Sequence, residues 1–259
     1  MHPKVSIITT TYNGEKYLEE SIDSMLGQTF NNFEYIIVDD GSTDSTLEKL
    51  QLIDDSRVRI IKQKNQGQTK ALITGIEQAQ GELIARIDQD DYSLHTRLMC
   101  QVEFMDSHPE VVLCGSRFQE LYDNKLAPQR VPFAQTNAEI KKIISRFNPL
   151  AHSSIMFRRD AYFEVGGYDK QFTIGMDYDL FIRLMTIGKV YNIEDVLTVI
   201  RMHDESNSMA QARLKTLECI KIRCRAYSKF GGNPLLTGYF FLKSLLGLIS
   251  PRCAKALFC

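Results

Sequence analysis

Two groups of aspartates are the residues whose types and spacing point most clearly to chemistry. Asp39 and Asp40 form the first group, and Asp88, Asp90 and Asp91 form the second. Carboxylates gathered this closely repel one another unless a cation or hydrogen-bond donors compensate their charge. Carboxylate oxygens are ligands that Mg²⁺ and Mn²⁺ accept, usually with substrate phosphates in the remaining positions. The pair Asp88 and Asp90 therefore predicts a site for Mn²⁺ or Mg²⁺ and a nucleotide diphosphate.

The sequence offers no glycine-rich cradle for the phosphates of that nucleotide. Neither G-x-x-x-x-G-K-[ST] nor a G-x-G-x-x-G after the first expected strand occurs. We therefore expect the nucleotide to be held through the metal. The first aspartate group keeps a second interpretation, because Asp-Gly-Ser at 40–42 is equally typical of a turn and helix cap.

The elements that must position these aspartates alternate between strand and helix in the first half of the chain. Apolar runs predict strands at 5–10, 35–38, 58–61 and 83–87, and helical spacing of apolar residues predicts helices at 15–28, 45–53 and 69–80. Strands that are apolar throughout are covered on both faces, which predicts a parallel α/β sheet. Ligands bind at the carboxyl ends of such strands, where both aspartate groups stand.

The second half of the chain has a looser order of elements. We expect strands at 111–114, 152–157 and 196–201, helices at 137–147 and 177–187, and a polar connection at 123–132. The sheet is then mixed but mainly parallel. We expect residues 1–210 to form one domain and residues 211–259 to form a basic helical tail.

Composition and charge describe an ordinary globular protein with an unusual end. The chain has 259 residues, of which 44% are hydrophobic and 24% charged, and its formal net charge is −1. Residues 211–259 hold nine Lys or Arg residues against one acid, so this segment carries +8 and the rest of the chain −9. An anionic partner is expected for the segment, while no nucleic acid is expected. The first residues lack the features of a secretory leader and the six cysteines form no CxxC pair, so we expect a cytoplasmic protein.

Several ordered motifs resemble one known family. They are Val5-Ser-Ile-Ile-Thr-Thr-Thr-Tyr-Asn13, Ser24-Met-Leu-Gly-Gln-Thr-Phe30, Ile37-Val-Asp-Asp-Gly-Ser-Thr-Asp44, Asn65-Gln-Gly67, Gly81-Glu-Leu-Ile-Ala-Arg-Ile-Asp-Gln-Asp-Asp91, Gly166-Gly-Tyr-Asp169 and Asp177-Tyr-Asp-Leu180. Over residues 3–210 the chain resembles the inverting family 2 glycosyltransferases, which have a nucleotide-diphospho-sugar-binding α/β fold called GT-A. Each motif is weak alone, but the ordered set is specific.

The resemblance implies roles for the residues at the strand ends. It implies that Thr10, Tyr12 and Asp40 line the nucleoside pocket, and that Asp39 or Asp88 reaches the ribose hydroxyls. The resemblance also implies that Asp90, the last carboxylate of a DxD pattern, is a metal ligand. Asp91 is either a second ligand or a cap for a helix expected near Ser93. His203, in Arg201-Met-His203, is implied as a metal ligand or diphosphate contact, with an ordinary surface histidine as the alternative.

The same resemblance implies that Asp177 is the catalytic base. An inverting transfer needs a carboxylate that takes the proton of the attacking acceptor hydroxyl, a role that contributes about 10²- to 10⁴-fold in rate. A helix N-cap is the structural alternative for this residue. Many relatives have Glu directly before this Asp, whereas Gly175 and Met176 precede it here. Details of the acceptor therefore do not carry over.

These observations predict a metal-dependent glycosyltransferase. The expected donor is a UDP-sugar, and the expected acceptor is a hydroxyl of a surface glycan or lipid-linked saccharide. A sugar nucleotidyltransferase would need a glycine-rich phosphate loop, which is missing. A catalytically silent nucleotide-sugar-binding or glycan-binding subunit is the alternative from another class. The +8 segment, with its apolar run at 235–249, is expected to lie on an anionic membrane or to form a homodimer interface.

Overall fold

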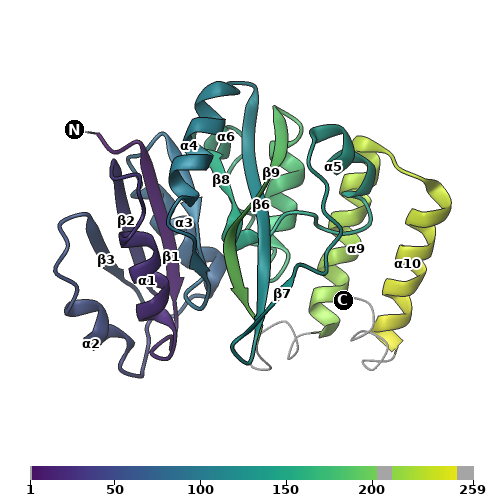
Figure 1. The fold of residues 1–259 in the computed structure, drawn as a ribbon. Coiled ribbons are helices and arrows are strands. Elements are labelled where there is room, and N and C mark those ends of the chain that lie inside the picture. The colour runs from purple at the N-terminus through teal and green to yellow at the C-terminus, as the bar shows by residue number, and fades with distance from the viewer. Residues whose placement is uncertain (1, 203–211, 250–259) are drawn as a thin grey trace.

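The computed structural model describes residues 2–202 and 212–249. Its described strands form one mixed nine-stranded sheet with the order β3-β2-β1-β4-β8-β6-β9-β5, and β7 pairs with β6 beside this path. Figure 1 shows the sheet curving through the molecule, with two long helices from the end of the chain on one side. The mixed α/β fold expected from the sequence is confirmed.

The first half of the chain builds the parallel part of the sheet. Its strands are β1 (Val5–Thr11), β2 (Phe33–Asp39), β3 (Val58–Lys62) and β4 (Leu83–Arg86). Its helices are α1 (Leu18–Leu26), α2 (Thr46–Gln51) and α3 (Gln68–Glu77). Because β1 pairs in parallel with both β2 and β4, the carboxyl ends of these three strands share one edge. Both aspartate groups follow strands that end there.

The second half adds strands of both directions. They are β5 (Tyr92–Ser93), β6 (Val111–Tyr122), β7 (Lys125–Pro128), β8 (Met156–Arg158) and β9 (Lys189–Arg201). The helices are α4 (Arg97–Ser107), α5 (Asn137–Ile143), the 3₁₀ helix η1 (His152–Ser154), α6 (Arg159–Glu164) and α7 (Met176–Leu184). Short β8 runs antiparallel to both β4 and β6 and so joins the two halves.

Several predicted boundaries after residue 90 were wrong. The strands expected at 111–114 and 196–201 are the ends of the long parallel pair β6 and β9, which continues through polar residues. The polar connection at 123–132 contains β7, which forms a hairpin with β6. Residues 152–154 form a 3₁₀ helix, so the following strand begins only at Met156. The helix expected near Ser93 begins at Arg97, because Ser93 pairs with β9 instead.

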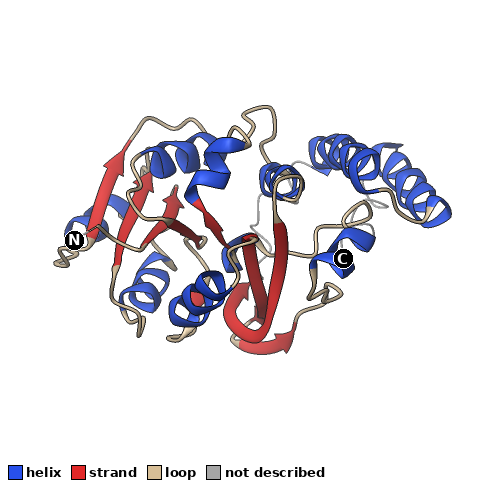
Figure 2. Ribbon diagram, turned by 90° about the horizontal axis from the view of Figure 1, so that it is seen from above, coloured by secondary structure: helices blue, strands red, loops and turns tan. Residues whose placement is uncertain are grey.

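Two hydrophobic clusters cover the two faces of the sheet, and Figure 2 shows helices on both sides of it. Alternate residues of β1 divide between them, with Ile8 in one cluster and Ile7 in the other. The first cluster also contains apolar residues of α3 and α7, and the second contains apolar residues of α1 and α4. Since each face has its own helices, the strand ends between them are the natural place for an open site.

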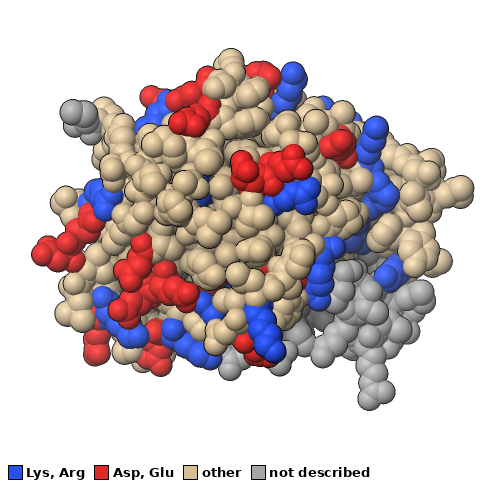
Figure 3. All heavy atoms as spheres, viewed as in Figure 1, with Lys and Arg blue, Asp and Glu red and all other residues tan. Residues whose placement is uncertain are grey.

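The basic segment at the end of the chain forms two helices, α9 (Ala212–Phe230) and α10 (Pro234–Ile249). Ile222 and Ala226 of α9 are fully buried in the same cluster as α7, whereas Leu235 of α10 is 86% exposed. Figure 3 shows basic side chains along the side of the molecule where these helices lie, and acidic ones gathered at the lower left. Within the described ranges, no helix combines the length and apolar character needed to cross a membrane.

Candidate active site

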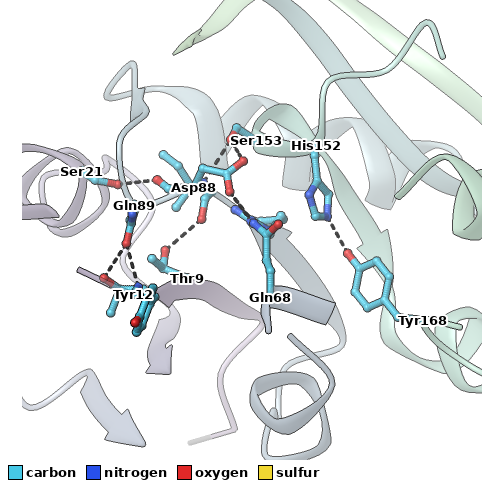
Figure 4. A network of polar contacts seen from close by, with 12 residues as sticks. Thr9, Tyr12, Ser21, Gln68, Asp88, Gln89, His152, Ser153 and Tyr168 are labelled. Atoms are coloured by element: carbon cyan, nitrogen blue, oxygen red, sulfur yellow. Dashed lines mark hydrogen bonds and ion pairs between the residues drawn. The ribbon is translucent and has the colours of Figure 1, made fainter. Parts of the chain in front are cut away.

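The end of β1 is tied to the turn after β4 by one glutamine. Oε1 of Gln89 accepts hydrogen bonds from Thr11 Oγ1 at 2.6 Å and from the Tyr12 backbone N–H at 3.0 Å (Figure 4). Thr10 is buried at the strand end, whereas the Tyr12 side chain is 46% exposed beside it. The first loop therefore presents an aromatic ring to solvent on a backbone that is held in place.

The aspartates after β2 organise the neighbouring loops. Asp39 is buried and accepts a hydrogen bond from the Ser42 backbone N–H at 3.2 Å. Asp40, also buried, accepts bonds from Gln63 Nε2 at 2.7 Å and from the backbone N–H groups of Gln66 and Gly67 at 3.0 and 2.8 Å. These contacts shape the loop that enters α3. The sequence alone did not indicate that Asp40 has this structural role.

Asp88, after β4, has both charged and neutral partners. It forms an ion pair with Arg86 and accepts hydrogen bonds from Gln68 Nε2 at 3.0 Å and Ser153 Oγ at 2.8 Å (Figure 4). Arg86 itself is 1% exposed, so its guanidinium lies directly beneath the site. Burial acts to raise the pKa of Asp88, but the Arg86 charge, together with the hydrogen bonds from Arg86 and Ser153, holds this pKa below its usual value. Asp88 is therefore ionised at neutral pH.

Asp90 and Asp91 complete a concentration of negative charge beside Asp88. Asp91 is buried and accepts a hydrogen bond from the Arg201 backbone N–H at 2.8 Å, which ties the end of β9 to this turn. Asp91 therefore does not cap the next helix. Burial, followed by the charges of Asp90 and Asp88, raises the pKa of Asp91 well above its usual value. A cation next to these carboxylates would relieve that repulsion.

The residues fit a divalent cation that is shared with phosphate oxygens. Among the residues that the structure describes, no three His, Cys, Asp or Glu side chains converge as a complete metal site. Mg²⁺ and Mn²⁺ at nucleotide sites need only one or two carboxylates, because substrate phosphates and water supply the other ligands. Asp90 lies beside Asp88 and Asp91 and is suited to be such a carboxylate ligand. The other expected ligand, His203, lies outside the described residues.

Asp177 stands in the first turn of α7 and faces the same cavity as Asp88. The cavity has a volume of about 290 Å³, and its polar lining residues are Asp88, Asp91, Asn148, His152, Ser153 and Asp177. Asn148 Nδ2 donates a hydrogen bond of 3.0 Å to Asp177 Oδ2. Burial, together with the negative charge of Asp88, raises the pKa of Asp177 to about 6. A carboxyl group with this pKa can take up a proton near neutral pH.

His152 lines the same cavity as the two carboxylates and is a neutral group. Its Nε2 is 2.7 Å from the hydroxyl of Tyr168 (Figure 4). Burial and the nearby Arg86 charge lower the pKa of His152 to about 3, so the imidazole is uncharged. Asn148, Ser153 and Gln68 complete the cavity lining and the carboxylate contacts, and the sequence pattern did not predict these roles. Asn148 lies on a loop, Ser153 in the short helix η1 and Gln68 at the start of α3, where no periodic pattern marks them. Arg86 alone carried a signal, as a charge within an apolar strand.

Comparisons with known proteins agree with this geometry. The family model described as "Glycosyl transferase family 2" matches residues 6–166. The amylovoran biosynthesis glycosyltransferase AmsE of Erwinia amylovora is 33% identical over 203 residues, covering 76% of this chain and 75% of that protein. An uncharacterized glycosyltransferase of Rickettsia typhi is 32% identical over 233 residues, covering 84% of this chain and 70% of that protein.

Solved structures with a similar fold include nucleotide-sugar complexes. Residues 1–349 of S. aureus TarS in complex with UDP-GlcNAc align with a TM-score of 0.69 and 18% identity, over 98% of this chain and 83% of that one. The mannosyltransferase PcManGT from Pyrobaculum calidifontis in complex with GDP-Man and Mn²⁺ aligns with a TM-score of 0.66 and 18% identity. This alignment covers 99% of the present chain and 74% of PcManGT. At this identity the likeness concerns the fold.

Proposed function

Since the chain belongs to glycosyl transferase family 2, we propose that it is an inverting, metal-dependent enzyme that transfers a sugar from a UDP-sugar to a hydroxyl group. The proposed acceptor is a surface glycan or a lipid-linked saccharide. The solved neighbours hold UDP-GlcNAc in one case and GDP-Man with Mn²⁺ in the other, which supports a nucleotide-sugar donor and a divalent cation.

One observation carries the proposal: Asp88 and Asp177 line the same cavity with opposite pKa shifts. The ionised Asp88 belongs to the donor side, and Asp177 faces it with a raised pKa. In the proposed reaction Asp177 accepts the proton of the acceptor hydroxyl as its oxygen bonds to the anomeric carbon. The bond from that carbon to the nucleotide diphosphate breaks on the opposite side, which inverts the configuration.

In the proposed site, residues at the strand ends bind the nucleoside of the donor. Tyr12 packs against the base, Thr10 and Asp40 line the nucleoside pocket, and Asp39 or Asp88 contacts the ribose. Oδ2 of Asp40 accepts a hydrogen bond from the Gly67 N–H, and a carboxylate oxygen can accept a second one, from the N3–H of a uracil.

The metal is proposed to sit between the protein and the donor phosphates. Asp90 and His203 would hold the Mn²⁺ or Mg²⁺ ion. When bound, the cation neutralises charge on the nucleotide diphosphate as it leaves.

Two linked measurements test this proposal. A panel of UDP- and GDP-sugars with Mn²⁺ is screened by thermal shift, since a ligand at 100 times its Kd adds about 2.7 kcal/mol to native stability. The stabilising donor is then used in a transfer assay, and the anomeric configuration of the product is measured by NMR. We expect a UDP-sugar to stabilise the protein and the product to be inverted. Retained configuration, or no response to any nucleotide sugar, would refute the proposal.

The C-terminal segment is proposed to bring the enzyme to the cytoplasmic face of a membrane. Leu235, Tyr239 and Leu242 of α10 are 86%, 57% and 59% exposed, and nine basic residues accompany them in the segment. Apolar side chains enter the interface of a bilayer, while each base near anionic lipid adds about 1 kcal/mol. Such contact would place the site near a lipid-linked acceptor. Residues 1–210 are proposed as the transferase domain.

Co-sedimentation with vesicles tests the membrane contact. The full chain and a version that ends at Gly232 are compared with anionic and neutral lipids, at low and high salt. We expect only the full chain to sediment, with anionic lipid and at low salt. Equal behaviour of the two versions would reject membrane contact, and loss of a dimer on truncation would identify α10 as a homodimer interface instead.

A further inference from the structure

Glu218 on α9 binds the segment that leads into α7. Both oxygens of its carboxylate are used: Oε1 accepts hydrogen bonds from the backbone N–H and Oγ1 of Thr173 at 2.9 and 3.1 Å. Oε2 accepts bonds from the backbone N–H groups of Ile174 and Gly175 at 3.0 and 2.8 Å. Glu218 is 4% exposed and is the only acid in residues 211–259. One buried carboxylate thus binds three consecutive residues immediately before α7.

The start of α7 lacks a cap of its own. Its N-cap is Gly175, which has no side chain to bind the free N–H groups of the first turn. Glu218 provides four hydrogen bonds and a negative charge at this position, and a negative charge is favourable at a helix N-terminus. Among these donors the Gly175 N–H belongs to the helix terminus, so Glu218 satisfies one free donor of α7 from another helix, about forty residues later in the sequence.

Two further contacts pack α9 against the same segment. Ile222, one turn after Glu218, is fully buried, and a Cβ added at Gly175 would lie 2.6 Å from its Cδ1. Asp179, two residues after Asp177, is fully buried and forms ion pairs with Arg183 of its own helix and with Arg225 of α9. The backbone is therefore fixed by α9 on both sides of Asp177.

We propose that Glu218 is a positioning residue for Asp177, so that α9 completes the active site without touching the substrate. This inference rests on the proposed function of Asp177 as the base. The Asp177 carboxylate accepts a side-chain hydrogen bond from Asn148 and is also bound by the backbone of Tyr178 and of Asp177 itself, so its position depends largely on the backbone that carries it. A misplacement of about 1 Å of a catalytic group lowers the rate by about a hundredfold.

Glu218→Gln is the main test, with Glu34→Gln as its matched control. Glu34 also uses its carboxylate for several bonds, from Ser6 Oγ, the Gln80 N–H and Arg59, but it lies at the opposite end of β2 from the site. We expect Glu218→Gln to lower kcat by about ten- to a hundredfold with unchanged donor Kd. Hydrogen exchange of the amides at 173–175 should become faster. Glu34→Gln should keep the kcat of the folded enzyme even where it lowers Tm.

Arg225→Gln provides a second variant if Glu218→Gln does not fold. It removes the guanidinium that pairs with Asp179, and the Arg225 side chain is 38% exposed, so its loss should disturb folding less. We expect Arg225→Gln to lower kcat, but by a smaller factor than Glu218→Gln does. The proposal is overturned if kcat and amide exchange at 173–175 stay within about twofold of the wild type. It is also overturned if Glu34→Gln lowers kcat equally. An inactive Asp177→Asn beside a fully active Glu218→Gln would reject this inference alone, whereas an active Asp177→Asn would reject the proposed base itself.

Discussion

The pKa values of the carboxylates on the two sides of the cavity are shifted in opposite directions. On the side of the parallel strands, Asp88 lies against the buried Arg86 and keeps a low pKa. On the α7 side, Asp177 has the neutral Asn148 as its partner, and its pKa rises to about 6. Carboxylates whose environments drive their pKa values apart are suited to different tasks. Negative charge is thus kept on the side that is proposed to bind the donor, and proton affinity on the side that is proposed to bind the acceptor.

Removal of the divalent cation should have the largest effect and concerns the donor side. The repulsion among the carboxylates at 88–91 would prevent a nucleotide diphosphate from binding without a cation. In excess chelator we expect transfer to fall to background and to return with Mn²⁺ or Mg²⁺. Asp90→Asn should weaken metal-dependent donor binding, measured by calorimetry. Full activity in excess chelator would contradict this prediction.

Asp177→Asn tests the acceptor side. We expect turnover to fall by at least about a hundredfold, because the amide cannot accept the proton, while donor Kd stays unchanged. Burial destabilises the charged form of this carboxyl above a pH of about 6, so the neutral variant should be at least as stable as the wild type in thermal unfolding. Near-normal turnover would mean that another residue is the base.

Arg86→Met should reduce the difference between the electrostatic environments of Asp88 and Asp177. The substitution leaves Asp88 without its charged partner, so donor affinity should fall by about tenfold and stability by about 2 kcal/mol. Since the Arg86 charge also lowers the pKa of Asp177, the acidic inflection of kcat should move to higher pH. An unchanged pH profile, measured on folded protein, would show that the two carboxylates are not coupled through Arg86.

The pH dependence of the wild type should show the smallest of these effects. Asp177 acts as a base only when ionised, so kcat should fall about tenfold per pH unit below its pKa and be level above it. A cation beside Asp88 cancels a charge that raises this pKa, so the inflection with bound metal should lie below 6. The measurement is kcat at saturating donor and metal. A rate that rises as the pH falls would exclude Asp177 as the base.

The sequence predicted the donor half of the molecule well. Continuous apolar runs such as Ile36–Val38 identified strands that are covered on both faces, and the aspartates that follow them lie at the shared strand edge. The family indicated by the ordered motifs is confirmed. These features are local in sequence, so one short segment contains both the strand and its polar end.

The acceptor half was harder to predict because its contacts join distant segments. Asn148 meets Asp177 across 29 positions, and Glu218 meets Gly175 across 43. The apolar pattern of β6 is interrupted by polar residues such as Ser116, which is buried in the sheet, so the strand was expected to end early. The roles proposed for the site residues remain predictions that the experiments above test.

The three-residue strand β8 also suggests where such an enzyme can be divided and recombined. It pairs with β4 on one side and β6 on the other, so it is the seam between the donor half and the acceptor half. The family match ends at residue 166, shortly after this seam, whereas Asp177 and Glu218 both follow it. A chimera that takes a new acceptor half should therefore inherit α7 and α9 together, since the proposed base and the residue proposed to hold it form one exchangeable unit.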